Sequence, residues 1–219
     1  PNKERIFRLQ EDRLKAGVME NRWAPAVGLV GPSVKEDFHE VEEYTQVFPY
    51  ELAGPAPVVS FEDHFFKERL TFFATDQFFN VFSVKVIRGH ASEALRRPST
   101  VAISQSIARK YFGDTDPLGK MLSFDRVEHF EVTAVFEDFP PNAHFHPDLL
   151  LSMETLLKEW GYKLTWGNGG FHTYVLLRTG VHPEEFESKL PAFLLRRAGE
   201  QLKIWNEEMV LNLQRIDNI

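Results

Sequence analysis

Three side chains with metal-ligand chemistry recur at every second position, namely His144, His146 and Asp148. Alternate residues of a strand point to one face, so in a strand this spacing would bring two imidazoles and a carboxylate together. These groups are all zinc ligands, and a metal-dependent enzyme is therefore one hypothesis. Against it, the run follows Pro140-Pro141-Asn142-Ala143, where a histidine commonly caps a turn, and no H-E-x-x-H motif occurs.

Other residues of catalytic type are better explained by local structure. Ser104 lies in Ile-Ser-Gln-Ser-Ile rather than in G-x-S-x-G, and its position predicts a helix N-cap. The glycine-rich run 166–170 is not followed by Lys-Ser/Thr or by a helical pattern, so it predicts a turn and no phosphate loop. The acidic run 36–43 is typical of a solvated face. We therefore predict no catalytic residue and no cofactor.

Composition and charge narrow the class of protein. Of the 219 residues 43% are hydrophobic and 26% charged, which is typical of a globular protein rather than a disordered chain. The net charge of −7 argues against a nucleic-acid partner, because such binding depends on neutralising phosphates. The absence of cysteine excludes disulfides and thiol chemistry. No segment is apolar over the roughly 20 residues that a membrane helix needs. Because the chain opens on Pro1 without methionine, we expect a soluble piece of a larger protein.

The hydrophobic pattern predicts an α+β fold. The clearest local unit is 100–113, where a short strand is followed by Ser104, an apolar helix face and Gly113 as the helix stop. A second helical face combines Val27, Val30, Val34 and Phe38. Further predicted helices are a short one capped by Asp76, one at 156–160, and one at 183–199 kinked at Pro191. The predicted strands are 5–10, 44–50, 58–61, 65–73, 84–87, 120–124, 130–136, 149–153, 174–177 and 209–213.

Phenylalanine is frequent, with 20 residues, and three pairs occur at 65–66, 72–73 and 78–79. Neighbours in a strand point to opposite faces, so both faces of such a strand must be covered or one must stay exposed. Burial within a small layered domain is one interpretation. The other is an apolar contact surface, which leads to a second hypothesis: a free-standing periplasmic or cell-surface protein that binds a hydrophobic ligand.

Several motifs then resemble one family. The run VAISQSIARKYFG at 101–113, followed by DPLGK at 116–120, resembles the V-x-L-S-x-S-x-A-x-K-Y-F-G … DP-x-GK signature of MacB-type periplasmic core domains, found in ABC transporter permeases of the FtsX-like class. Weaker similarities follow in the same order along the chain, at 4–8, 32–41, 78–89, 130–144 and 211–218. Ala134, Ala143 and His39 stand where the family usually has Gly, Ser and Pro.

The resemblance implies a porter-like core of two βαβ-type halves, residues 1–55 and 130–219, with a strand-rich, Sabre-like subdomain inserted at 56–129. It implies a non-catalytic domain on the periplasmic, extracytoplasmic face of the bacterial inner membrane. The domain would couple cytoplasmic ATP hydrolysis to export or to mechanical action on a substrate or partner. The implied partners are a cytoplasmic ABC ATPase on a separate subunit or domain, a second permease subunit or half, and a periplasmic adaptor or substrate protein. By itself the domain is expected to be a monomer at micromolar concentration.

Overall fold

The chain divides into two units in the computed structural model, which describes residues 2–219. Unit 1 combines the chain up to Gln46 with Leu164–Ile219, and unit 2 is Val47–Lys163. These limits differ from the predicted subdomains, 1–55 with 130–219 and 56–129. Strands β10 (Glu128–Phe136) and β11 (Leu149–Ser152) pair with strands of the middle segment, which places 130–163 in unit 2. The porter-like and Sabre-like assignment stays a prediction.

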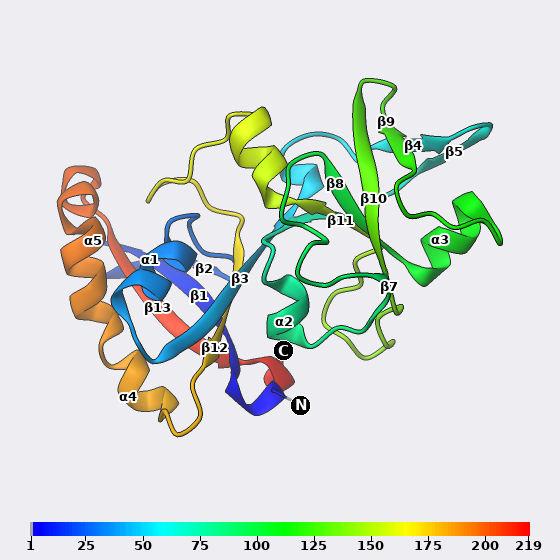
Figure 1. Cartoon of the computed structure of the whole chain (residues 1–219). Helices are drawn as coiled ribbons and strands as arrows, with labels where there is room; N and C mark the ends of the chain where they lie inside the picture. Colours follow the sequence, from blue (N-terminus) through cyan, green and yellow to red (C-terminus); the bar gives the residue numbers. More distant parts are fainter. Residues whose placement is uncertain (1) are drawn as a thin grey trace. The chain divides into compact units, whose positions relative to one another are not determined.

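Unit 1 is built around β1 (Ile6–Lys15), drawn in blue in Figure 1. One edge of β1 pairs with β13 (Glu208–Arg215), and the other pairs first with β12 (His172–Leu177) and then with β2 (Val18–Trp23), all antiparallel. The first part of β3 (Val41–Pro49) lies beside β12. Two short 3-10 turns flank these strands, η1 (Lys3–Arg5) and η4 (Ile216–Asn218).

The core of unit 1 lies between this sheet and three helices, α1 (Val30–Asp37), α4 (Pro183–Glu187) and α5 (Leu190–Trp205). The predicted face of Val27, Val30, Val34 and Phe38 is buried there, as expected. The predicted single helix over 183–199 is wrong, because the chain forms two helices. Pro191 lies in the first turn of α5, where its missing N–H has no helical partner to lose.

Unit 2 is a mixed sheet in the order β6 (Thr71–Ala74), β11, β8 (Thr100–Ser104), β10, β9 (Met121–Phe124), β4 (Val58–Phe61) and β5 (His64–Lys67). The pairs β6–β11 and β8–β10 are parallel and the others antiparallel. The end of β3 pairs with β6, and β7 (Val86–Gly89) pairs with β10. Helices α2 (Phe78–Phe82) and α3 (Gln105–Phe112) and two single turns, η2 (Tyr50–Leu52) and the π-helical η3 (Thr155–Glu159), complete the unit. The predicted α+β class is confirmed.

Local sequence patterns predicted some elements of unit 2 correctly and others wrongly. The Ser104 hydroxyl accepts the Ile107 N–H at 3.2 Å, so the predicted N-cap of α3 is confirmed. Gly113 ends the same helix with a φ of 58°, as predicted. Asp76 is not the cap of α2, whose N-cap is Gln77 without a side-chain bond. The predicted strand 65–73 is two strands, β5 and β6.

Candidate functional site

The first and last strands of the chain are neighbours in unit 1. In the register of β1 and β13, Phe7 lies opposite Arg215 and Leu14 lies opposite Glu208. The turns η1 and η4, next to the two chain ends, are in contact with each other (Figure 1). A displacement applied to both ends would therefore enter the unit through one pair of hydrogen-bonded strands. We call β1 and β13 together the terminal strand pair.

Side chains fix the terminal strand pair near the chain ends. Arg8, which is almost fully buried, donates from Nη2 to Oε1 of Gln214 at 2.6 Å, across the pair. Arg5 donates to the carbonyl of Leu177 at 2.8 Å and forms an ion pair with Glu42 at 2.5 Å. Charged donors make hydrogen bonds roughly twice as strong as neutral ones. The end of the strand pair is thus tied to β12 and β3 of the same unit.

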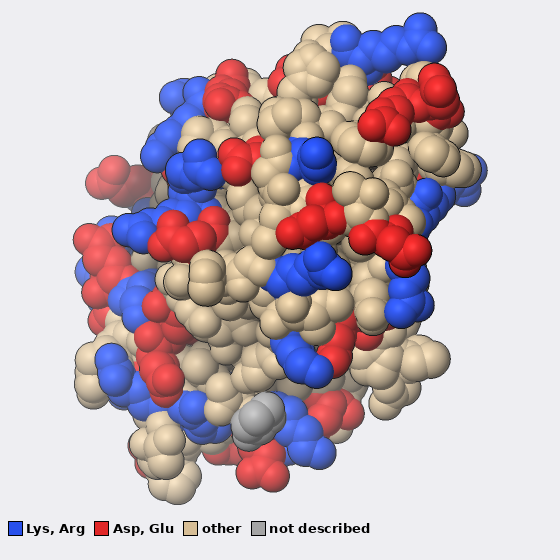
Figure 2. Space-filling model, turned by 45° about the vertical axis from the view of Figure 1, so that its right-hand side comes forward, with Lys and Arg blue, Asp and Glu red and all other residues tan. Residues whose placement is uncertain are grey.

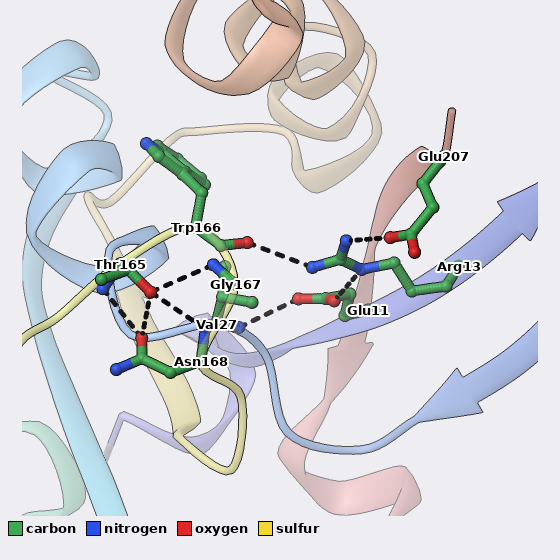
Figure 3. A network of polar contacts seen from close by, with 8 residues as sticks. All are labelled: Glu11, Arg13, Val27, Thr165, Trp166, Gly167, Asn168 and Glu207. Atoms are coloured by element: carbon green, nitrogen blue, oxygen red, sulfur yellow. Dashed lines mark hydrogen bonds and ion pairs between the residues drawn. The ribbon is translucent and has the colours of Figure 1, made fainter. Parts of the chain in front are cut away.

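A polar cluster lies toward the other end of the strand pair (Figure 3). Glu11 is fully buried and accepts from Arg13 Nε at 2.5 Å and from the Val27 N–H at 2.9 Å. Arg13 also donates to Glu207 at 2.8 Å and to the carbonyl of Trp166 at 3.2 Å. A buried carboxylate is tolerated only when it is paired and hydrogen-bonded in this way. We call Glu11, Arg13 and Glu207 the Arg13 cluster.

A rigid turn presents the Trp166 carbonyl to the Arg13 cluster. Oδ1 of Asn168 accepts from the backbone N–H and the hydroxyl of Thr165, at 2.8 and 2.9 Å. The Thr165 hydroxyl oxygen in turn accepts from the backbone N–H groups of Gly167 and Asn168 (Figure 3). The glycine-rich run therefore forms the predicted turn. Its polar groups bond to one another and to Arg13.

Burial shifts the pKa of Glu11 and of His172 in unit 1. It raises the pKa of Glu11, while the Arg13 guanidinium and the Val27 N–H act in the opposite direction. It lowers the pKa of His172 to about 4, with the positive charge of Arg8 adding to the effect. His172 is therefore neutral near pH 7. Glu11 links Arg13 to the Val27 backbone within the unit.

The predicted metal ligands are not brought together. The expectation that His144, His146 and Asp148 share a strand face is wrong, because this segment lies between β10 and β11 and is not part of a strand. Phe145 instead packs its ring into a phenylalanine cluster, and Pro147 offers no N–H for strand pairing. Across residues 2–219, no group of three or more His, Asp or Glu side chains is placed to hold a metal ion.

Some phenylalanines of the three pairs are buried in the domain, and others are exposed as a contact surface would require. Phe73, Phe78 and Phe79 are buried in unit 2, as expected of a small layered domain. Phe65 and Phe66 are exposed on β5, at the edge of the sheet. Lys110 lies 4.1 Å above the Phe66 ring, a cation–π contact that covers part of it.

The surface carries both signs of charge. On the face drawn in Figure 2, Lys and Arg side chains are interspersed with Asp and Glu. Exposed ion pairs of unit 2 include Arg88–Asp116 and Lys85–Glu137. Among residues 2–219, no helix is both long and apolar enough to cross a membrane.

Sequence reasoning missed the Arg13 cluster. The predicted strand 5–10 ended too early, because the three consecutive charged residues Glu11, Asp12 and Arg13 interrupt the hydrophobic alternation. The available signal was opposite charge at positions 11 and 13, which share a face of a strand. Glu207, 194 residues further along, could not be found from local pattern.

Comparison with known proteins now identifies the class. The profile of the MacB-like periplasmic core domain family matches residues 3–193. The chain therefore belongs to this family of periplasmic domains of ABC transporter permeases, which are non-catalytic. The predicted resemblance is confirmed. A comparison with curated protein sequences finds no match.

Solved structures agree with the family. A domain assigned to a permease protein of Porphyromonas gingivalis is 28% identical, with a TM-score of 0.82, covering 98% of this chain and 91% of that one. The periplasmic region of MacB from Actinobacillus actinomycetemcomitans has the same fold at 14% identity, a TM-score of 0.64 and coverages of 95% and 89%. The extracellular domain of the noncanonic ABC-type transporter YknZ from Gram-positive bacteria is 13% identical, with a TM-score of 0.57. The match covers 87% of this chain and 90% of that one.

Proposed function

We propose that this domain passes movement of the membrane part of an ABC transporter permease to a substrate or partner on the periplasmic side. Family membership supports the location, and the terminal strand pair is the observation that supports the mechanical role. The proposed partners are a cytoplasmic ABC ATPase on a separate subunit or domain, a second permease subunit or half, and a periplasmic adaptor or substrate protein.

The positions at which the chain enters and leaves unit 1 support a mechanical role. Phe7 and Arg215 are opposite each other, so membrane segments attached at the two ends would move the same end of one strand pair. When both attachments move together, they carry the unit as a rigid body. Arg5, Arg8 and Gln214 stiffen this point through charged hydrogen bonds.

The test uses the full-length permease reconstituted with its ATPase. The chain has no cysteine, so Leu195→Cys on α5, 76% exposed, accepts a single spin label within the domain. A second label is placed at the outer end of a membrane helix in the second permease subunit or half, relative to which the domain is proposed to move. We expect the distance between the labels to change on ATP addition. An unchanged distance would overturn the proposed function.

Flexible linkers then test the route of coupling. Gly/Ser linkers of about ten residues are inserted between the domain ends and the membrane helices. They uncouple the position of the domain from the position of the helices, because such linkers behave as random coils. We expect ATP hydrolysis to persist while the ATP-dependent distance change is lost. The matched control inserts the same linker at Val127, in the exposed turn between β9 and β10, and retains the change.

A further inference from the structure

A pocket of about 340 Å³ opens beside the Arg13 cluster, entirely within unit 1. Its walls include two indoles, Trp23 from the end of β2 and Trp205 from the end of α5. Its charged lining residues are Arg13, Glu20 and Glu207. The volume falls within the range of small-ligand sites, which is about 300–1,000 Å³.

Each indole packs against a glycine and stays partly exposed, and the Arg13 guanidinium lies 6.0 Å from the centroid of the Trp205 ring. Gly167 lies under Trp205, where an added Cβ would stand 2.9 Å from the ring. Gly169 lies against Trp23, where an added Cβ would stand 3.6 Å from the ring. Gly167, in the turn at 165–168, therefore backs Trp205 and the nearby Gly169 backs Trp23, while Trp23 and Trp205 remain 43% and 37% exposed. Large aromatic side chains that stay exposed at a cavity offer their faces to a ligand.

The electrostatics of the pocket favour a cation. The positive charge of Arg13 is already matched by Glu11 beneath it and by Glu207. Glu20 has no hydrogen-bond or ion-pair partner within residues 2–219, and it adds an uncompensated negative charge. Trp205 is also the last residue of a 16-residue helix, whose C-terminal end carries a partial negative charge. Indole faces attract cations as well.

We propose that this pocket binds an organic cation, a guanidinium or primary ammonium group on a short aliphatic stem. The cationic head would lie between Glu20 and the indole faces, and the stem would cover the exposed edges of Trp23 and Trp205. The same chemistry occurs in a free diamine-type metabolite and in a basic side chain of a peptide. This inference does not depend on the proposed mechanical role.

Calorimetry and tryptophan fluorescence on the purified chain test the proposal, with agmatine and the peptide acetyl-Gly-Arg-Gly-amide as probes and pentanamide as a neutral control. We expect saturable 1:1 binding of a cationic probe and none of pentanamide. Binding of agmatine alone assigns the site to small free cations, and comparable binding of the peptide assigns it to basic side chains. Failure of both probes to bind overturns the proposal.

Variants locate the binding. Glu20→Gln is expected to weaken agmatine binding about 5-fold, the effect of one partly exposed charge pair. Trp205→Leu is expected to weaken it about 10-fold, and Trp205→Phe less, because a phenyl face attracts cations more weakly than an indole. The matched control Glu200→Gln removes an exposed charge on the same helix, outside the pocket lining, and leaves affinity unchanged. Equal affinities of the Glu20 and Glu200 variants would show nonspecific attraction and overturn the assignment. Circular dichroism confirms that each variant is folded.

Discussion

In unit 1 the buried residues include five charged side chains, and four of them, Arg8, Glu11, Asp12 and Arg13, lie on β1. In unit 2 the buried charged set is reduced to Glu68, and the interior is filled by phenylalanine rings. Charged groups stabilise a protein only in one register, because each must meet its partner, whereas aromatic rings gain mainly from burying area. The difference indicates that β1 is specified for its position against β13 rather than only for hydrophobicity.

The ring cluster of unit 2 gives the largest expected loss of stability. Phe78 is fully buried and lies within 6.3 Å, between ring centroids, of Phe79, Phe82, Phe139 and Phe145. Phe78→Ala removes these contacts and leaves a cavity, so the free energy of unfolding is expected to fall by about 3–4 kcal/mol. Urea denaturation measures it. The control Phe65→Ala, at a 48% exposed site, is expected to cost under about 1 kcal/mol, and equal losses would contradict the comparison.

The Arg13 cluster gives a loss of similar size by a different mechanism. Glu11→Ala leaves the Arg13 guanidinium without its buried partner and is expected to cost about 3 kcal/mol. A double-mutant cycle with Arg13→Met separates pairing from packing. If the pair acts as a unit, the double variant loses less than the sum of the single losses. Additive losses in urea denaturation would show that the two charges do not cooperate.

The buried imidazole of unit 1 predicts a pH dependence. Because the pKa of His172 is lowered to about 4 in the folded state, the unfolded chain binds more protons between pH 4 and pH 6.5. The free energy of unfolding is therefore expected to fall as the pH is lowered through this range, by about 2 kcal/mol. His172→Gln should remove that part of the slope. A variant with an unchanged stability–pH profile would assign the slope to other groups.

A helix cap in unit 2 gives the smallest effect. Ser104→Ala removes the bond to the Ile107 N–H and is expected to lower the free energy of unfolding by about 1 kcal/mol. Ser104→Thr keeps a hydroxyl cap and should retain most of the stability. Thermal unfolding of the two variants compares them. A loss in Ser104→Thr as large as in Ser104→Ala would show that the packing of this buried position, not the cap, decides stability.

Local pattern predicted most elements where a residue's own neighbours decide its conformation. The strand, cap and stop of the 100–113 segment are confirmed, because Ser104 and Gly113 act over one helical turn. It failed for β2, whose six residues are all exposed and therefore show no buried alternation. That strand forms because Ala16 and Gly17 take positive φ and fold it back onto β1. It also failed at 144–148, where the packing of Phe145 against other phenylalanine rings outweighs a strand spacing.

The sequence by itself determined the α+β class, the family and the buried helical face of unit 1, because these depend on residue types and short spacings. Only the tertiary structure decided which distant residues meet. It placed the first and last strands side by side, brought Glu207 to Arg13, and set Trp23 and Trp205 around one pocket. The physical reason is that strand pairing and ion-pair burial join residues separated by most of the chain, and no local periodicity records such a contact.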